Sequence, residues 1–365
     1  MGDTTTASIL DRCRALGFAL AGVASAQRSN RVAELRAWLE AGRNGSMSWL
    51  EDHLELRIDP RALVPAAQSV ICVADRYADG RPDRRDRSLA GRVARYARGA
   101  DYHTALRRRL ETLRDELRRT HPKHRFRACV DTAPILEREQ AARAGLGAIG
   151  KHTLLIEPGV GSWLLLGEIV TTLALEPTTS DAALDVCGTC SRCIDACPTA
   201  AIEPWTVDAS RCISYLTIER RLPIDPTLHA AIGDWIFGCD ICQEVCPHCQ
   251  PTRRSRAAKR HPDYAPVRTT LDALEVLGWN EDDWARAGRS GPLERATLAM
   301  FRRNALIVAT NTCPPERRAE LAARFRTVAE SSEEDPMVRE TARQSLSRLA
   351  RPEPTAKDSA QSEES

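Results

Sequence analysis

The sequence predicts an α/β or α+β N-terminal domain, then a small cysteine-rich module of ferredoxin-like type, and finally an all-α, HEAT-like part. Helix and strand patterns alternate through residues 1–175, eight cysteines gather between positions 187 and 246, and only helix periodicity follows position 300. At 365 residues the chain is long enough for more than one hydrophobic core. We expect these parts to span 1–178, 179–252 and 253–350, followed by a disordered, apolar-poor tail at 351–365.

The first part of the chain carries helix patterns. Residues 4–60 read as helical, with one apolar face over positions 9–16 that ends at Gly17. A second face runs over positions 32–39, and Gly42 follows it as a C-cap signal. We therefore expect helices ahead of the first buried strand.

Two short apolar runs predict buried strands, at 69–75 and 125–130. The segment between them begins with an arginine-rich loop, Arg76–Arg98, which is either a solvated insertion or a surface that faces nucleic acid. An amphipathic helix follows at 103–120, because its leucines recur at helical spacing and its arginines occupy the other faces.

The next elements should complete the N-terminal domain. Residues 135–144 predict a helix, which the glycines at 145, 147 and 150 bring to an end. Two strand patterns follow at 153–156 and 163–175. The E-P-G-V-G-S segment between them predicts a hairpin-like connection.

The cysteine module is recognised by its spacing. C-G-T-C-S-R-C-I-D-A-C-P spans 187–198, and C-D-I-C-Q-E-V-C-P spans 239–247. In bacterial ferredoxins such a run holds one 4Fe–4S cluster with three cysteines, while its fourth cysteine ligates the other cluster. The crossed pattern predicts one cluster on Cys187, Cys190, Cys193 and Cys246, and a second on Cys197, Cys212, Cys239 and Cys242.

Other uses of cysteine fit this sequence less well. C-x2-C pairs also bind zinc, but two C-x3-C-P endings are not typical of zinc sites. Thirteen cysteines would suggest disulfides only in a short secreted chain, and Cys72 and Cys129 lie in apolar runs as buried thiols. With neither a long apolar run nor a signal-peptide pattern, we expect a cytoplasmic protein without a membrane partner.

Asp131 is the candidate catalytic residue. It follows a predicted strand and precedes T-A-P, beside a glycine-rich loop, where active sites often form. Burial there would raise the pKa of its carboxyl and let it hold a proton near neutral pH. The alternative is a helix N-cap for the helix near 135, and the pattern alone leaves both open.

Two further motifs invite functional interpretation. G-L-G-A-I-G-K-H at 145–152 approaches a P-loop, but His152 replaces the hydroxyl residue that binds magnesium. A glycine-rich turn that approaches a bulky ligand is the better interpretation. D-Y-H-T-A-L at 101–106 approaches a cobalamin-ligand signature, but Leu106 replaces its glycine. We therefore expect His103 to cap the helix or contact a ligand, and not to bind cobalt.

Taken in order, these motifs resemble the epoxyqueuosine reductase family. The specific blocks are V-D-T-A-P-I-L-E-R (130–138), G-L-G-A-I-G-K-H-T-L-L-I (145–156) and G-S-W-L-L-L-G-E-I (161–169), followed by the two cysteine runs. Y-A-R-G-A-D-Y-H-T-A-L-R-R-R-L (96–110) and the HEAT-like end also fit. The resemblance covers roughly residues 5–350.

The resemblance implies reduction of the epoxide of epoxyqueuosine, at the wobble position of tRNA, to the alkene of queuosine. It implies two 4Fe–4S clusters and a base-off cob(II)alamin in the N-terminal domain, with Asp131 as the catalytic acid. It also implies a monomer that receives electrons from a flavodoxin or ferredoxin system and binds the tRNA anticodon arm. The residues expected at the cobalamin are Arg57, Tyr102, Asp131, Gly147, Gly150, Lys151, His152 and Ser162.

Three departures from the family pattern affect the neighbourhood of the cofactors. Ala148 stands where the family usually has Trp, and His152 where it usually has Asn. The second cysteine run continues as C-P-H-C, where C-P-W-N is usual, and so adds Cys249 as a ninth cysteine. None of these changes touches Asp131 or the eight predicted ligands.

Two other classes of function compete with this one. A reductive dehalogenase shares the cofactors, but normally carries an export signal, lacks a HEAT-like end and uses a tyrosine acid. A plain electron carrier would not need about 180 residues ahead of its clusters. Arg76–Arg98, with eight arginines, and Arg253–Arg260, with four arginines and a lysine, suit the phosphates of tRNA rather than a small neutral substrate.

Overall fold

The computed structural model describes residues 2–83, 88–178, 185–289 and 291–350. Its N-terminal part is built on an antiparallel sheet with strand order β1-β2-β7-β4. These strands are β1 (Leu20–Ser25), β2 (Ser69–Arg76), β7 (Leu164–Thr171) and β4 (Phe126–Cys129). An antiparallel sheet with helices packed on it is an α+β arrangement, which decides between the two predicted classes.

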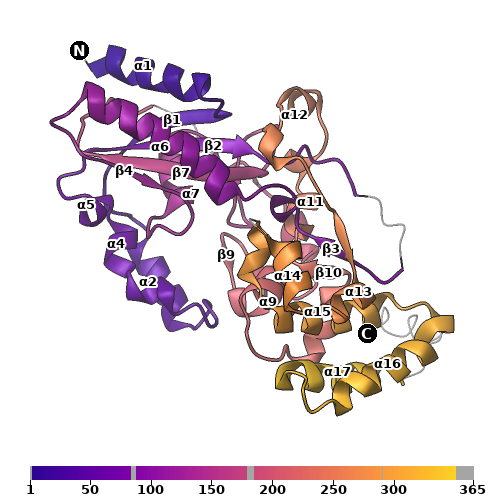
Figure 1. Ribbon diagram of the computed structural model, residues 1–365. Coiled ribbons are helices and arrows are strands. Elements are labelled where there is room, and N and C mark those ends of the chain that lie inside the picture. Colours follow the sequence, from indigo (N-terminus) through magenta and orange to yellow (C-terminus); the bar gives the residue numbers. More distant parts are fainter. Residues whose placement is uncertain (1, 84–87, 179–184, 290, 351–365) are drawn as a thin grey trace.

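Helices cover both faces of this sheet (Figure 1). One face packs against α1 (Gly2–Ala15) and α6 (Tyr102–Thr120), whose Leu106, Leu110 and Leu113 are buried. The other face packs against α7 (Glu137–Arg143) and the region around Leu63. Burial on both faces explains why β2 is a nearly continuous apolar run and was predictable from the sequence.

The expectation that residues 4–60 are entirely helical is wrong. The segment contains strand β1, which pairs antiparallel with β2 from Leu20↔Ala74 to Ser25↔Ser69. Small residues with weak strand propensity dominate L-A-G-V-A-S. At Gly22 an added Cβ would lie 2.2 Å from the Ala144 carbonyl oxygen, so close packing with the α7 region selects these small residues.

The predicted hairpin between 153–156 and 163–175 is also wrong. β6 (Leu155–Ile156) pairs with β5 (Ala148–Ile149), whereas β7 runs between β2 and β4 in the main sheet. The two strands exist, but the E-P-G-V-G-S turn holds only one isolated bridge, Glu157↔Gly161. Strand patterns locate strands without naming their partners.

A second sheet joins three distant parts of the chain, with strand order β10-β3-β11. β3 (Ala90–Val93) pairs with β10 (Trp235–Phe237) of the cysteine-rich part and with β11 (Thr270–Asp272) of the C-terminal part. β3 lies inside the stretch expected to be an arginine-rich loop. That expectation is wrong for residues 90–97, which form β3 and a short 3-10 turn at Arg95–Ala97.

The arginines of this stretch explain the error. Arg92, Arg95 and Arg98 are buried rather than solvated or exposed to nucleic acid. They surround Asp83, with Arg98 Nη2 2.6 Å from its carboxylate. Burial disfavours the Asp83 carboxylate, but the hydrogen bonds and charges of these arginines outweigh it and lower its pKa to about 2. Arg84, Arg85 and Arg87 lie outside the described residues.

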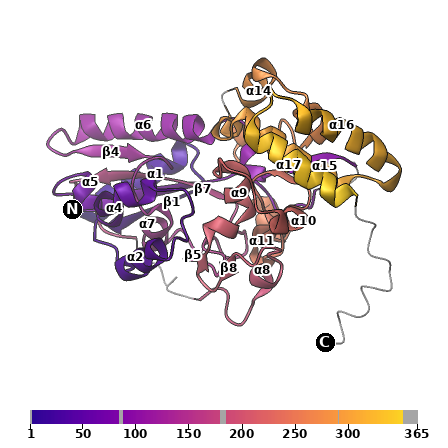
Figure 2. The same ribbon diagram turned by 90° about the horizontal axis from the view of Figure 1, so that it is seen from below.

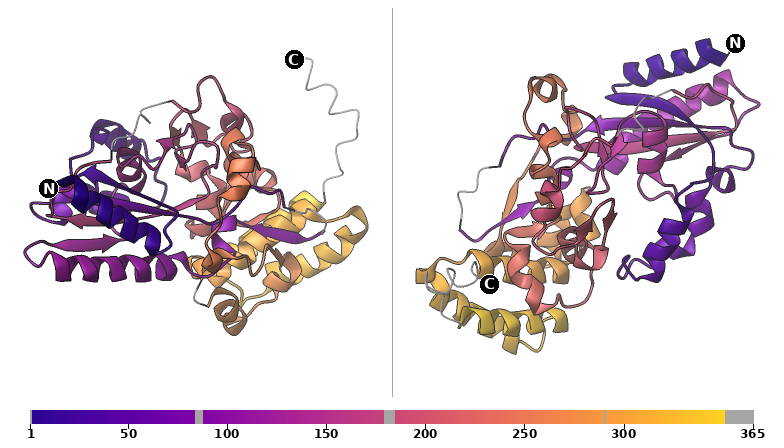
Figure 3. Two further views of the ribbon diagram at one scale, coloured as in Figure 1. Left: turned by 90° about the horizontal axis from the view of Figure 1, so that it is seen from above. Right: turned by 180° about the vertical axis from the view of Figure 1, so that it is seen from behind.

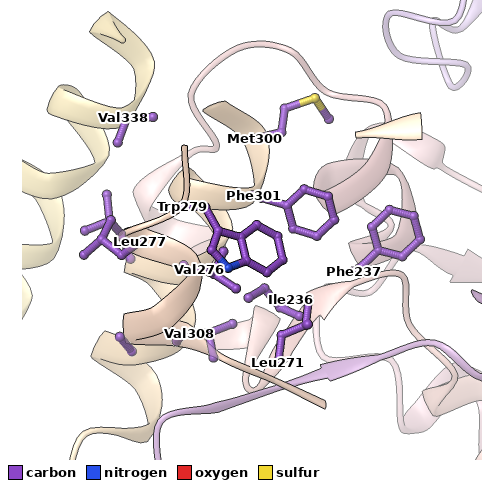
Figure 4. Close-up of a cluster of buried hydrophobic side chains, with 14 of the residues drawn as sticks. Ile236, Phe237, Leu271, Val276, Leu277, Trp279, Met300, Phe301, Val308 and Val338 are labelled. Atoms are coloured by element: carbon purple, nitrogen blue, oxygen red, sulfur yellow. The ribbon is translucent and has the colours of Figure 1, made fainter. Parts of the chain in front are cut away.

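The C-terminal helices pack around one large apolar core (Figure 4). Phe237 of β10 stacks on Phe301 of α15 (Leu298–Thr312), with ring centroids 5.7 Å apart. α16 (Arg318–Glu330) and α17 (Pro336–Leu349) close the outer side, as the helix periodicity of 316–350 predicted. Figures 2 and 3 show these helices at the opposite end of the molecule from α1, with the cysteine-rich part between them.

Short elements make up the rest of the described chain. The helices are α2 (Val32–Glu40), α3 (Trp49–Asp52), α4 (Leu54–Ile58), α5 (Pro60–Leu63), α8 (Arg192–Asp195), α9 (Ile213–Ile218), α10 (His229–Ile232), α11 (Ile241–Glu244), α12 (Arg253–Ala257), α13 (Ala273–Leu277) and α14 (Glu281–Gly288). β8 (Ile202–Glu203) pairs with β9 (Thr206–Val207). Among the described helices, none has the length and apolar character needed to cross a membrane. The tail expected to be disordered, 351–365, lies outside the described residues.

Candidate functional site

Asp131 stands two residues beyond the end of β4, on an exposed turn. Its backbone is in the left-handed region (φ 49°), an uncommon conformation for a residue other than glycine and one that often marks functional sites. Its backbone N–H donates to Glu137 Oε1 at 2.6 Å. Leu136, not Asp131, is the N-cap residue of α7, so the helix-cap alternative is wrong. With a side chain 51% exposed, the carboxylate is open to a substrate.

The start of α6 places two donors on this carboxylate. His103 Nε2 lies 2.8 Å from Asp131 Oδ2, and the Tyr102 hydroxyl also hydrogen-bonds Asp131. Asp101 is the N-cap of α6, accepting from the His103 backbone N–H at 3.0 Å. The same Asp101 oxygen lies 2.8 Å from His103 Nδ1. The His103 ring therefore bridges two carboxylates, while Asp101 performs the capping that was one expectation for His103.

The electrostatics of Asp131 differ from the expectation. Burial alone would raise its pKa, but the hydrogen bond and charge of His103, with Tyr102 and Arg295, lower it below the usual value. Correspondingly, the hydrogen bond to Asp131 raises the pKa of His103, against the opposing effect of burial and with further help from Asp101. A proton shared between the two side chains is therefore favoured on His103 over Asp131. The prediction of a raised Asp131 pKa is wrong because it ignored these donors.

Two carboxyl groups behind Asp131 were missed in the sequence analysis. Burial, followed by the negative charge of Asp131, raises the pKa of Glu137 to about 7. Glu168 of β7 is fully buried, neither of its oxygens has a hydrogen-bond partner among the described residues, and burial raises its pKa well above the usual value. The sequence does carry a signal for this residue, because Glu168 is the one charged residue in the apolar run L-L-L-G-E-I-V-T. Such a group is expected to be a neutral acid.

The structure brings the predicted cluster cysteines close to one another in the cysteine-rich part. In the first set, Cys193 has its pKa raised by burial and by the nearby thiols of Cys187, Cys246 and Cys190. In the second set, burial raises the pKa of Cys242, and the charges of neighbouring thiols and of Asp240 raise it further. The members of this set are Cys197, Cys212, Cys239 and Cys242. The charge of Cys193 in the first set also raises the pKa of Cys242, so the two sets are neighbours.

No trio of His, Cys, Asp or Glu side chains within the described ranges converges on a mononuclear metal position.

Lys151, His152 and Ser162 lie against the cysteine-rich part. The Lys151 backbone N–H donates to Cys187 Sγ at 3.4 Å, and its Nζ donates to the carbonyls of Gly188 and Cys190. His152 is buried, and with the Cys249 thiol it contributes to lowering the pKa of Cys246 to about 4.

Ser162 contacts the same region, because its hydroxyl donates to Gln243 Oε1 at 3.0 Å. These three residues, expected at the cobalamin, thus sit on the cluster side of the site.

Gly147 and Gly150 belong to the β5–β6 hairpin, which connects the Asp131 side of the site to the cysteine-rich side. A Cβ on Gly147 would lie 2.3 Å from the Ile156 carbonyl oxygen, and one on Gly150 would lie 2.5 Å from Ile156 Cδ1. The close approach that these glycines permit is therefore to Ile156 of the hairpin itself. Because the segment forms a hairpin and not a strand–loop–helix, the P-loop alternative is wrong.

Arg57 lies on the side of the site that carries Asp131 and Glu137. Its Nε is buried without a hydrogen-bond partner among the described residues, and its guanidinium lies over the Trp49 ring, 5.5 Å from the centroid. Burial lowers its pKa, partly offset by the charge of Glu137. A buried donor without an acceptor is a group that a polar ligand could satisfy.

Comparison with known families agrees with this geometry. Residues 57–132 match the family described as "Epoxyqueuosine reductase QueG, DUF1730", and residues 186–249 match the "4Fe-4S double cluster binding domain". The second match confirms the prediction of a double 4Fe–4S domain, so the zinc alternative is wrong. The assignment of individual cysteines to each cluster stays a prediction.

Curated relatives extend the likeness to most of the chain. The epoxyqueuosine reductase of Synechococcus sp. (strain RCC307) is 40% identical over 295 residues, covering 79% of this chain and 88% of the relative. That of Escherichia coli (strain K12) is 36% identical over 303 residues, covering 81% of this chain and 78% of the relative.

Among solved structures, an epoxyqueuosine reductase with an epoxyqueuosine-modified tRNA-Tyr stem loop superposes with a TM-score of 0.84. It has 26% identity and covers 95% of this chain and 91% of that chain. The enzyme from Streptococcus thermophilus gives 0.81 at 25% identity, covering 97% of this chain and 93% of that chain.

Proposed function

Because this chain belongs to the epoxyqueuosine reductase family, we propose that it reduces epoxyqueuosine at the wobble position of tRNA to queuosine. The observation that carries the proposal is Asp131, an exposed carboxylate held by His103 and Tyr102, in a chain whose next part is a double 4Fe–4S domain. An acid and a source of single electrons are what removal of an epoxide oxygen requires. The relatives at 36–40% identity favour this reading over a reductive dehalogenase.

We propose cob(II)alamin as the cofactor between the acid and the clusters, held base-off in the N-terminal domain. The residues present fit it, because Arg57 offers a buried donor without an acceptor on the acid side. Tyr102 and Asp131 would face it from that side, and Gly147, Gly150, Lys151, His152 and Ser162 from the hairpin and the cluster side. When bound, reduced cobalt supplies the nucleophile or one-electron donor for the hard step.

This chain's own residues would handle the oxygen and its protons. Asp131 would protonate the epoxide oxygen as the C–O bond weakens, because its carboxylate is the exposed member of the hydrogen-bonded group. Tyr102 and His103 hold that carboxylate in place, which is the orientation that proton transfer needs. The eight cysteines would hold the clusters that relay electrons singly from a flavodoxin or ferredoxin donor.

We further propose that a monomer binds the anticodon arm in the cytoplasm. The arginines of α12, Arg253, Arg254 and Arg256, are exposed and suit phosphate contacts. The stacked pair α16 and α17 would form a HEAT-like repeat in the C-terminal part. The stem-loop complex of the solved relative supports a tRNA substrate for this chain too.

The test is anaerobic purification with cobalamin, then incubation with epoxyqueuosine-containing tRNA and mass analysis of the nucleosides. We expect queuosine to replace epoxyqueuosine. Asp131→Asn should keep iron, cobalamin and tRNA binding but convert about 10²–10⁴-fold more slowly, as for a lost general acid. Activity of Asp131→Asn within a few fold of the parent protein would remove Asp131 from the reaction. Failure of the parent protein to convert the nucleoside would overturn the function itself.

A further inference from the structure

His103 lies directly behind the candidate acid, and the role given to it above is only to orient Asp131. Its Nε2 is 2.8 Å from Asp131 Oδ2, and its Nδ1 is 2.8 Å from Asp101 Oδ1. The His103 side chain is 29% exposed, against 51% for Asp131. Asp131 is therefore the more accessible group for a substrate, while the ring behind it still reaches solvent.

We propose that His103, held by Asp101, stores the proton that Asp131 donates and reloads Asp131 between two successive proton transfers. This inference rests on the proposed function, because reduction of an epoxide to an alkene consumes two protons. A single carboxyl donates one proton at a time. A site with one exposed acid must therefore be reloaded before each turnover is complete.

The balance of the step is simple. Both C–O bonds of the epoxide break, a carbon–carbon double bond forms, and the oxygen leaves as water. Two electrons come from the clusters and ultimately from the flavodoxin- or ferredoxin-class donor. Each proton passes from His103 Nε2 to Asp131 Oδ2 and on to the oxygen, and solvent restores the proton on His103. Asp131 and His103 end the cycle in the states in which they began it.

The resting charges suit this order of transfer. The pKa of His103 is raised and that of Asp131 is lowered, so a proton shared by the pair favours His103 before the reaction begins. As negative charge develops on the substrate oxygen, the transfer through Asp131 becomes favourable. The charged and titratable groups facing this pair are Asp101, Tyr102, Tyr96, Glu137, Arg138, Glu168 and Arg295.

Local structure holds the ring in the position that the relay needs. Asp101 caps α6 through the His103 backbone N–H and accepts from the His103 ring, so the helix start fixes both. The Tyr102 ring stacks on His103 with centroids 4.0 Å apart. His103 is thus a positioning residue that acts through Asp131, and Asp101 keeps Nε2 directed at Asp131.

The first experiment is single-turnover conversion of epoxyqueuosine tRNA by holoenzyme that excess chemical reductant has already reduced. In the parent protein the rate should fall as pH rises through the raised pKa of His103, because the stored proton is then absent. His103→Gln can keep a hydrogen bond to Asp131 but carries no transferable proton. We expect it to be about 10²–10⁴-fold slower and to lose that pH limb.

Matched variants separate proton storage from structure. Added imidazole should restore much of the rate of His103→Ala, which loss of structure would not allow. Asp101→Asn keeps a capping oxygen but removes the charge, so the pH limb should move to lower pH. His121→Gln, about 27 Å away at the end of α6, should behave as the parent protein.

A second readout does not depend on turnover. Diethyl pyrocarbonate modifies neutral imidazole, so the pH dependence of its reaction at His103, followed by peptide mass analysis, reports the pKa of that ring. We expect a midpoint above the ordinary histidine value of about 6.5, and a lower midpoint in Asp131→Asn.

Two results would overturn the relay. One is an unchanged rate and pH profile in His103→Gln. The other is a diethyl pyrocarbonate midpoint at the ordinary histidine value that Asp131→Asn does not change. Either can occur while the parent protein still makes queuosine, in which case the proposed function stands and the relay alone fails.

Discussion

Cys249 is buried three residues after Cys246, in a short 3-10 turn that Pro247 begins. Its sulfur accepts a hydrogen bond from the Ser162 backbone N–H at 3.3 Å. The hydrogen bond to Cys246, followed by burial, raises the pKa of Cys249, whereas the pKa of Cys246 is lowered to about 4. Cys246 and Cys249 are thus close neighbours, and the assignment of Cys246 rather than Cys249 as the cluster ligand stays a prediction.

This assignment predicts the iron content of three variants. Anaerobically reconstituted protein should hold about eight irons and eight sulfides. Cys246→Ala and Cys212→Ala should each damage one cluster, and in the crossed assignment a different one. Cys249→Ala should keep all the iron. Iron and sulfide analysis with electron paramagnetic resonance would measure this, and loss of a whole cluster in Cys249→Ala alone would contradict the assignment.

At the scale of elements, the β5–β6 hairpin connects the acid side of the site to the cysteine-rich part. Trp205 donates its backbone N–H to the carbonyl of Lys151, and the Arg138 guanidinium donates to the Thr153 carbonyl at 2.8 Å. The hairpin is thus fixed from both sides, and its own interior leaves no room beside Gly147. We infer that a rigid hairpin keeps Asp131 and the first cysteine set in a fixed position relative to each other.

Gly147→Ala tests this close packing. Its added methyl group would lie 2.3 Å from the Ile156 carbonyl oxygen, so the hairpin must shift. We expect a loss of about 1–3 kcal/mol in the free energy of unfolding, as for other overpacked sites. The control is Gly278→Ala, where the nearest atom is 3.4 Å away and φ is not positive. Comparable unfolding midpoints for the two variants would contradict the explanation.

At the scale of the whole molecule, Arg303 of α15 ties the C-terminal helices to the cysteine-rich part. It is fully buried and donates to the carbonyls of Leu216, Arg220 and Leu222 and to Asn304 Oδ1. Burial, with the charge of Arg220, lowers its pKa to about 9. Because loss of this buried arginine would leave several carbonyl acceptors unpaired, Arg303 stabilises the contact between the C-terminal helices and the cysteine-rich part.

Arg303→Leu should therefore destabilise the fold strongly. The leucine roughly preserves the apolar volume but donates nothing, so we expect a loss of about 2–4 kcal/mol from the unpaired carbonyls. Urea unfolding followed by circular dichroism would measure it. Arg326→Leu on exposed α16 is the control and should change stability by less than about 0.5 kcal/mol. Equal effects of the two changes would exclude this role for Arg303.

The substrate also acts at the scale of the whole molecule. Arg92, Arg95 and Arg98 are buried and paired with carboxylates, so they cannot be the phosphate contacts that the sequence suggested. Exposed α12 is the remaining predicted surface.

Replacing Arg253, Arg254 and Arg256 by Ala should weaken tRNA binding and flatten its dependence on salt between roughly 50 and 200 mM, with iron content unchanged. Filter binding over a salt series would measure both. An unchanged slope would move the tRNA to another face.

The sequence alone determined the features that depend on local pattern or spacing. Cysteine spacing was sufficient for a double 4Fe–4S domain, because ligation imposes a fixed order along the chain. The apolar runs of β2 and β4 and the leucine stripe of α6 located these elements, since burial on a sheet or helix face has its own period. The order of motifs around Asp131 was sufficient to indicate the family.

Only the tertiary structure decided which groups meet. β1 pairs with β2, and the buried Arg92 pairs with Glu244, so both depend on partners far away in sequence that local propensity does not report. Even for β6, the strand pattern did not show that its partner is β5 rather than β7. The charge state of Asp131 was missed for the same reason. Its pKa depends on His103, 28 residues earlier, and a hydrogen bond across that separation exists only once α6 and β4 have packed on one sheet.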